Sequence, residues 1–427
     1  MKISGTITMF MTKQENNTVA VIGGGAAGLM AAVFAARAGA DVTVFERNDR
    51  MGRKLRITGK GRCNLTNACD INTFLTNVPR NPKFLYAALN RLSPSDTMEL
   101  FEELGVPLKT ERGRRVFPVS DKAADIADAL VRECRRLGVR FEKTRISAIC
   151  TEDGKIKSVS DTKGEYPCAA VLICTGGASY PLTGSQGDGY RLARSLGHTV
   201  TDIKPSLVPI VAGGICADCQ GLSLKNIGFK IIKNSNGSTV YDDFGELMFA
   251  HFGLTGPLVL SASAHIPDIA PDKYTALIDL KPALDHKMLD ARLVSDFSKY
   301  SNRDFANALG DLLPQKLIAP TVRLSGIDGA KKVHSVTKEE RTRLCELLKA
   351  LPVPLIRFRP IDEAIVTSGG VDVKEINPKT MESKLVRGLY FAGEVIDTDA
   401  YTGGYNLQIA FSTGAVAGEN AAWSAQE

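Results

Sequence analysis

The sequence of 427 residues predicts an α/β protein whose first part is a Rossmann-like dinucleotide-binding domain. Residues 19–46 combine two β-branched strands, a G-x-G-x-x-G turn and an Ala-rich helix. Residues 169–174 form a continuous apolar run, which is typical of a central strand in a parallel sheet. After residue 205 the pattern changes to short alternating strands with Asn/Gly turns, so we expect a β-rich insert to interrupt the domain.

The segment from Val19 to Glu46 carries each feature of a dinucleotide site. Gly23 permits a tight turn, Gly25 lets the backbone approach a pyrophosphate, and Gly28 allows close packing of helix on strand. The helix N-terminus adds free N–H groups and a partial positive charge. Glu46 follows Gly28 by 18 residues, where its carboxylate can accept from ribose hydroxyls. The segment therefore predicts a dinucleotide ligand and leaves FAD and NAD open.

The composition is that of a globular chain with more than one core. Hydrophobic residues make up 44% and charged residues 23%, and the length favours two or three domains. No apolar stretch reaches the ~20 residues that cross a bilayer. Residues 1–17 are polar and lack the pattern of a signal peptide. Nine cysteines follow no disulfide pattern, so we predict a cytoplasmic protein without a membrane partner.

Charge and cysteine spacing predict neither a nucleic-acid partner nor a metal. The net charge is only +6, and the basic residues lack interleaved aromatic residues. Cys216 and Cys219 form a C-x-x-C, but no second pair completes a zinc site. A small-molecule substrate is the expected partner, and the oligomeric state stays open.

The changes in pattern along the chain predict a discontinuous first domain. Charged helical segments follow the β-rich insert, and the last part of the chain returns to the first domain. The predicted parts are an N-terminal extension (1–17), the dinucleotide-binding domain (18–200 and 362–427), the β-rich insert (201–283 and 352–361) and a small helical cap (284–351).

Local signals predict the elements between the second strand and the insert. Ser93, followed by a proline, predicts a helix N-terminus, and Ser120 is predicted to cap a second, amphipathic helix. Residues 106–119 predict a hairpin. Two further strands are expected at 139–143 and 146–151.

Three later segments favour FAD over NAD. Residues 171–177 form an apolar strand that ends in Thr-Gly-Gly, and residues 388–394 form a strand that ends in Gly-Glu. Residues 402–410 predict a helix that starts near Tyr405, so its N–H groups would face the flavin edge where charge gathers on reduction. No second G-x-G-x-x-G is present, so NADH or NADPH would dock transiently.

Longer motifs give the chain a specific resemblance. They are MGRKL at 51–55, TGKGRCNLTN at 58–67, GRRVFP at 113–118, TGGASYP at 175–181 with TGSQGDG at 183–189, HFGLTGP at 251–257, and GE at 393–394 with GGYNLQ at 403–408. With them the chain resembles the BaiN-like flavoproteins, which include bacterial bile-acid 3-oxo-Δ4 reductases and aminoacetone oxidases. The resemblance implies a glutathione-reductase-type, Rossmann-like FAD domain, interrupted by a β-barrel-like domain and a small helical subdomain.

The resemblance also implies where FAD would lie. The ADP half would meet the glycine turn and Glu46, and the pyrophosphate and flavin would pass Arg53 and Lys54. Glu394, where most flavoproteins carry Asp, would reach the ribityl chain. The implied cofactor-binding residues are Gly23, Gly25, Ala26, Ala27, Gly28, Glu46, Arg47, Arg53, Lys54, Gly61, Arg62, Cys63, Thr175, Gly176, Gly177, Gly393, Glu394, Gly403, Gly404, Tyr405, Asn406 and Leu407.

Because the flavin carries the hydride, the protein needs no nucleophile but does need a proton donor or acceptor. The predicted acid–base residues are Tyr180, His251 and Tyr405, with Tyr401 as a further candidate. Any of these side chains could instead be a packed aromatic or a satisfied histidine.

Cys63 and Cys69 invite comparison with the redox pair of flavin disulfide reductases. That pair has the spacing C-x-x-x-x-C, whereas five residues separate the two cysteines here. The alternative is that Cys63 is a thiol packed near the flavin.

These observations predict an FAD-dependent oxidoreductase. We expect NAD(P)H-dependent reduction of an activated C=C in an enone, such as a 3-oxo-Δ4 steroid or bile acid. One alternative is an aminoacetone-type amine oxidase that uses O2, and another is a non-catalytic flavin-binding or RNA-associated protein.

Overall fold

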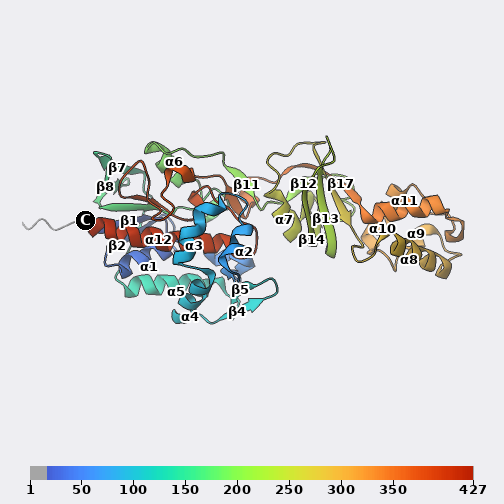
Figure 1. Ribbon diagram of the computed structural model, residues 1–427, viewed down its shortest axis with the longest axis horizontal. Helices are drawn as coiled ribbons and strands as arrows, with labels where there is room; N and C mark the ends of the chain where they lie inside the picture. Colours follow the sequence, from blue (N-terminus) through green and yellow to red (C-terminus); the bar gives the residue numbers. More distant parts are fainter. Residues whose placement is uncertain (1–16, 427) are drawn as a thin grey trace, which may run out of the picture.

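A computed structural model describes residues 17–426. The predicted N-terminal extension (1–17) lies outside the described residues except for Asn17. The molecule is elongated: a parallel-sheet part is followed by a β-barrel and then by a group of helices along the long axis (Figure 1). The predicted fold class, a Rossmann-like domain interrupted by a barrel and a helical subdomain, is confirmed.

A five-stranded sheet organises the first part, with all neighbouring strands parallel in the order β19-β10-β1-β2-β6. β10, predicted as a central strand, lies between β1 and β19 and is fully buried. Because the strands are parallel, the loops after β1, β10 and β19 meet at one edge. The strands are β1 (Thr18–Ile22), β2 (Asp41–Glu46), β6 (Arg140–Lys143), β10 (Ala170–Ile173) and β19 (Leu389–Phe391).

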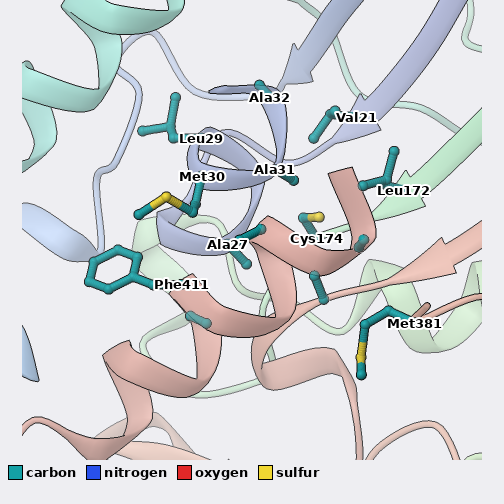
Figure 2. Packing of buried hydrophobic residues seen from close by; sticks show 14 of the residues in the cluster. Val21, Ala27, Leu29, Met30, Ala31, Ala32, Leu172, Cys174, Met381 and Phe411 are labelled. Carbon is teal, nitrogen blue, oxygen red and sulfur yellow. The ribbon is translucent and has the colours of Figure 1, made fainter. Parts of the chain in front are cut away.

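Two helices with small residues pack on each other against this sheet: α1 (Ala26–Arg37) and α12 (Tyr405–Gln426). A Cβ on Gly414 would lie 2.5 Å from the carbonyl oxygen of Ala27, and one on Gly418 would overlap that of Ala31. Figure 2 shows both alanines beside α12. The helices therefore approach closely only because these positions of α12 carry no side chain.

Smaller elements surround the sheet. Asp96 and Ser93 form a capping box at the start of α4, as predicted for Ser93. The elements are β3 (Thr66–Asn67), α2 (Ile71–Thr76), α3 (Tyr86–Arg91), α4 (Pro94–Glu103), β4 (Leu108–Glu111), β5 (Arg115–Pro118), α5 (Ala123–Arg136), β7 (Ala148–Glu152), β8 (Lys155–Ser160), β9 (Glu165–Pro167) and α6 (Asp188–Ser195).

The prediction that Ser120 caps a helix is wrong. α5 starts after Lys122, which supplies no side-chain cap. Asp121 adopts a left-handed conformation, with φ 55°, so the chain turns once more before the helix begins. The Ser120 hydroxyl accepts from the N–H of Lys122 (3.2 Å) and donates to Asp125 (2.6 Å).

The insert is a closed antiparallel barrel with the strand order β12-β15-β14-β13-β16-β17. Two short strands that pair with each other, β11 (Lys204–Ser206) and β18 (Val366–Ser368), connect it to the first part. The barrel region contains β12 (Ile210–Ala212), β13 (Ser223–Lys233), β14 (Thr239–Ala250), β15 (Gly253–Thr255), α7 (Pro257–Ser263), β16 (Tyr274–Asp279) and β17 (Leu351–Phe358).

Four helices lie at the far end of the barrel, away from the parallel sheet (Figure 1). They are α8 (His286–Lys299), α9 (Phe305–Ala308), α10 (Gln315–Ser325) and α11 (Lys338–Lys349). Their buried hydrophobic residues belong to the same apolar cluster as the barrel interior. Among the described residues, no helix combines the length and apolar character needed to cross a bilayer.

We predict that Gly414→Ala destabilises the protein. Ala normally stabilises a helix interior by roughly 0.5–1 kcal/mol relative to Gly, but here its methyl group would press on the Ala27 carbonyl. We expect a net loss of about 1–3 kcal/mol, seen as a lower urea midpoint of unfolding by circular dichroism. Gly310→Ala, where a Cβ meets open space, is the control. A midpoint for Gly414→Ala at or above that of the parent chain would refute this packing.

Candidate active site

A large pocket opens at the carboxyl ends of β1, β10 and β19 and encloses roughly 1770 Å³ of empty space, part of it open to solvent. Its lining extends from the glycine turn after β1 to the start of α12. Small-molecule pockets commonly have volumes of about 300–1,000 Å³, and the cavity volume comparable with that range is about 360 Å³. The pocket is therefore of the size of a small-molecule site.

The glycine turn after β1 is shaped by close approaches of backbone to backbone. A Cβ on Gly23 would lie 2.6 Å from the Cys174 carbonyl oxygen, and one on Gly28 would overlap the carbonyl of Gly23. A Cβ on Gly25 would meet nothing within 4 Å, and Gly25 lines the pocket. The turn thus leaves open backbone at the start of α1, where an anionic group is favoured.

Glu46 lines the pocket and also holds this turn in place. One carboxylate oxygen accepts from the N–H of Gly24 (2.8 Å). The other accepts from the N–H and the side-chain amide of Asn48, both at 2.8 Å. A carboxylate has about four lone-pair sites, so acceptor capacity remains for a ligand hydroxyl.

Lys54 and Glu394, which both line the pocket, form an ion pair. Lys54 Nζ lies 2.7 Å from Glu394 Oε2 and donates at 2.7 Å to the Ser179 hydroxyl. Glu394 Oε1 accepts from the Ser179 hydroxyl (3.1 Å) and the N–H of Thr367 (2.8 Å). Burial alone would raise the pKa of Glu394, but Lys54 and these donors hold it below its usual value.

The expected contact of Glu394 with a ribityl chain stays a prediction. Three protein donors engage its two oxygens, and a carboxylate has about four lone-pair sites, so acceptor capacity remains here as it does at Glu46. Lys54 reaches the carboxylate from the loop after β2. The pair still lines the pocket, with 23% of the Lys54 side chain and 19% of the Glu394 side chain exposed.

Two residues that line the pocket each carry a buried polar atom with no hydrogen-bond partner among residues 17–426. These atoms are Asn64 Oδ1, an acceptor, and Thr398 Oγ1, which can donate or accept. Such atoms are rare because an unpaired buried polar group is costly. Their placement therefore indicates a polar ligand edge that offers both a donor and an acceptor.

The far end of the pocket is formed by the loop that leads into α12. Asn67 donates to the carbonyl of Gly403 (3.1 Å), and a Cβ on Gly404 would overlap the carbonyl of Thr66. The Asn406 side chain donates to the Ala400 carbonyl (2.6 Å). The N–H groups of the first turn of α12 have no acceptors within the helix, so they place partial positive charge at this end.

One side of this end comes from the connection to the barrel, which we call the barrel-side wall. It consists of Leu207, Ile365 and Val366 from that connection, together with Tyr401 from the loop before α12. Leu207 follows β11 and Ile365 precedes β18, and the N–H of Ile365 donates to the Leu207 carbonyl (3.1 Å). The wall is mainly apolar, and Tyr401 adds a hydroxyl.

Most residues predicted to bind the cofactor line this pocket, and six do not. Arg62 points away because it pairs with Glu111 (2.5 Å) and Asp121 (2.6 Å) and lies over the ring of Phe117. Predicted residues that line the pocket are Gly23, Gly25, Ala26, Ala27, Glu46, Arg47, Arg53, Lys54, Thr175, Gly176, Gly393, Glu394, Gly403, Gly404, Asn406 and Leu407. Those outside the lining are Gly28, Gly61, Arg62, Cys63, Gly177 and Tyr405.

The structure does not bring the predicted acid–base residues together. Tyr180 is 38% exposed on a loop, with φ 51°, and His251 is exposed at the β14–β15 turn. Tyr405 is buried against Phe74 at a ring distance of 5.1 Å. None of the three lines the pocket, whereas the further candidate Tyr401 does.

The cysteines carry no site in the part of the chain that the structure describes. Cys63 and Cys69 are free, and burial raises the pKa of the Cys63 thiol to about 12. Cys216 and Cys219 are buried and free. Between residues 17 and 426, no group of His, Cys, Asp and Glu residues is arranged to hold a metal ion.

Sequence reasoning missed Asn64, Thr398 and the partners of Glu394. Asn64 lies within the motif at 58–67, but no local sequence pattern shows that its side-chain oxygen lacks a partner. Ser179 and Thr367 lie 215 and 27 residues from Glu394 along the chain, so only the fold brings them together.

The lining fits an FAD molecule. The open glycine turn and Glu46 suit the ADP half, and the start of α12 suits the isoalloxazine. Asn64 Oδ1 and Thr398 Oγ1 are complementary to the edge of that ring, where an N–H stands between two carbonyl groups.

Comparisons with known proteins agree with this reading. The family model described as the HI0933-like protein Rossmann domain matches residues 17–420. A 3-dehydro-bile acid delta(4,6)-reductase of Clostridium scindens is 32% identical over 431 residues, covering 95% of this chain and 99% of the relative. A ribosomal RNA dihydrouridine synthase of Escherichia coli is 30% identical over 398 residues, covering 92% and 95%.

Solved structures share the fold at low identity. A flavocytochrome c3 fumarate reductase in its open conformation superposes with a TM-score of 0.52 at 18% identity, over 97% of this chain and 79% of that one. A 3-ketosteroid delta1-dehydrogenase from Sterolibacterium denitrificans gives 0.51 at 13% identity, over 96% and 100%.

We predict that Glu394→Gln weakens FAD binding. The variant keeps the shape of the side chain but removes the charge paired with Lys54. Its NH2 group replaces a carboxylate oxygen and cannot accept from the donors that surround it. A buried donor left unpaired costs about 1–3 kcal/mol, so the Kd for FAD, measured by fluorescence titration of apoprotein, should rise about tenfold. Glu363→Gln, which breaks a surface pair with Arg359, is the control. Equal affinity in the two variants would contradict this role of the ion pair.

Proposed function

The chain belongs to the HI0933-like Rossmann-domain family of FAD-dependent oxidoreductases, and we propose that it reduces a C=C bond conjugated with a carbonyl group, with NADH or NADPH as the electron source. The observation that carries the proposal is the mainly apolar barrel-side wall beside the expected position of the isoalloxazine. Bound FAD supplies a hydride carrier at its N5 atom.

The relatives support a reductive direction. The names of the Clostridium and Escherichia relatives both describe saturation of a C=C bond, in a 3-dehydro bile acid and in uridine. In both substrates that bond is conjugated with a carbonyl group. By contrast, no feature of the described pocket specifically favours the oxidation of a small amine, so the aminoacetone-type alternative ranks lower.

The residues of the pocket have separate tasks in this reaction. Lys54 and Glu394 hold the loops around the cofactor, and the start of α12 favours negative charge on the reduced ring. Leu207 and Ile365 bind an apolar ring system and exclude water from it. We therefore propose an apolar enone, such as a 3-oxo-Δ4 steroid or bile acid, as the substrate.

A second candidate substrate is a uridine within RNA, and the tip of the β4–β5 hairpin favours it. Arg112 and Arg114 are exposed and have no acidic partner among the described residues. Asn67 donates to Gly113 (3.0 Å) as well as to Gly403 (3.1 Å), so the tip lies at the mouth of the pocket. Arginines at such a rim suit the phosphates of RNA.

Anaerobic half-reactions distinguish these substrates. We expect NADH or NADPH to bleach the flavin absorbance of the purified protein. Adding a 3-oxo-Δ4 bile acid should then restore the absorbance and give the saturated ketone, identified by mass spectrometry.

Reoxidation by uridine-containing ribosomal RNA alone would favour the second candidate. Bleaching of the oxidised protein by aminoacetone, but not by either nicotinamide nucleotide, would contradict the reductase proposal. Arg112→Ala with Arg114→Ala separates the two substrates further, because it should weaken turnover of RNA and leave that of the bile acid unchanged.

A further inference from the structure

Tyr401 lines the pocket and carries a hydroxyl without a hydrogen-bond partner among the described residues. Its backbone is fixed on both sides, because its N–H donates to the Asn77 carbonyl (3.0 Å) and its carbonyl accepts from the Asn406 amide (3.3 Å). The side chain is half-buried in the barrel-side wall. Within residues 17–426, no hydrogen bond engages its hydroxyl.

The barrel fixes the Tyr401 ring. His265, which follows α7, stacks on it with ring centroids 5.2 Å apart and an interplanar angle of 21°. His265 in turn contacts the ring of Tyr241 at 5.0 Å, and the Tyr241 hydroxyl donates to Asp243 (3.0 Å). The position of the hydroxyl is thus set from both sides of the junction between sheet and barrel.

The surroundings keep this hydroxyl protonated. Burial and the nearby carboxylate of Asp399 raise the pKa of Tyr401 above its usual value. Asp399 is itself buried and accepts from the hydroxyls of Ser206 (2.7 Å) and Ser368 (3.2 Å). At neutral pH, Tyr401 therefore has a proton to donate.

Other ionisable groups of the pocket are engaged elsewhere. Lys54 and Glu394 pair with each other, and Glu46 holds the glycine turn. Arg53 donates to the side chain of Asn48 (3.2 Å) near that turn. In the barrel-side wall, the Tyr401 hydroxyl is the group that remains free to contact a substrate.

We propose that Tyr401 is the catalytic proton donor of the C=C reduction and that His265 is its positioning residue; this inference rests on the proposed function. NAD(P)H is oxidised and supplies the hydride that the β-carbon gains, and bound FAD would be the carrier. The C=C electrons shift to give an enolate. The O–H bond of Tyr401 then breaks as its proton bonds to the α-carbon, and the phenolate regains a proton from water.

The test uses the FAD-loaded protein and two probes, 2-cyclohexenone and 1-nitrocyclohexene. Addition of hydride to the nitroalkene gives a nitronate, which is stable without a proton donor. We expect Tyr401→Phe to reduce cyclohexenone at least ~100-fold more slowly. The variant should consume the nitroalkene at the parent rate but release nitronate, whereas the parent releases the nitroalkane. FAD content should stay unchanged. Tyr86→Phe, on the exposed face of α3, is the control.

Unchanged cyclohexenone reduction by Tyr401→Phe, or the same nitro product from variant and parent, would overturn the inference while leaving the proposed function intact. If the parent protein reduced neither probe nor the bile acid, the proposed function would fail and the inference with it.

Two further measurements separate donation of a proton from a structural role. His265→Ala should shift the nitro product toward nitronate, and His265→Phe, which restores a stacked ring, should reverse that shift. In ¹³Cζ-tyrosine NMR spectra, the Tyr401 resonance is assigned as the one that is missing from Tyr401→Phe. Near pH 10, where free tyrosine is about half ionised, this resonance should keep the chemical shift of the protonated phenol. A Tyr401 resonance that titrates like free tyrosine, or failure of His265→Phe to rescue, would count against the proposal.

Discussion

The ion pair between Lys54 and Glu394 is the interaction on which the geometry of the pocket depends. Its acceptors and donors come from the loop after β2, the loop after β10, β18 and the loop after β19. Three of these segments follow strands of the parallel sheet, and β18 belongs to the connection with the barrel. Because the pair is largely buried, removing either partner leaves an uncompensated charge, which is strongly destabilising. The ion pair thereby joins the part of the pocket that is expected to bind the cofactor to the part that is expected to bind the substrate.

Close packing of glycine and alanine complements that pair. Gly414 brings α12 onto α1, which places the starts of both helices at the same edge of the sheet. Each start offers partial positive charge, one beside the glycine turn and one beside Gly404. A long dinucleotide with a reducible ring suits a pocket with positive ends, and the barrel supplies a wall that the sheet alone lacks. The cofactor would thus bind at the edge of the sheet, and the junction between sheet and barrel would select the substrate.

The sequence allowed the fold class and the glycine turn to be predicted, because both rest on local patterns. Gly23 and Gly25 are recognised from spacing alone, and so is the helix cap at Ser93. The prediction for Ser120 failed because the left-handed turn at Asp121 leaves no clear sequence signal. The contacts of the site were harder to predict, because they join residues that lie far apart in the sequence. Glu394 meets a lysine 340 residues away, and no periodicity reports such a contact. The stacking of His265 on Tyr401 joins separate parts of the chain in the same way.

A crystal structure of the FAD-loaded protein with a bound 3-oxo-Δ4 bile acid tests the central claim most directly. The account predicts that the edge of the isoalloxazine with the N–H between two carbonyl groups meets Asn64 and Thr398, and that the conjugated C=C stacks on the ring against Leu207 and Ile365. The α-carbon should then lie within reach of the Tyr401 hydroxyl. An isoalloxazine placed elsewhere, or a bile acid bound away from the barrel-side wall, would contradict it.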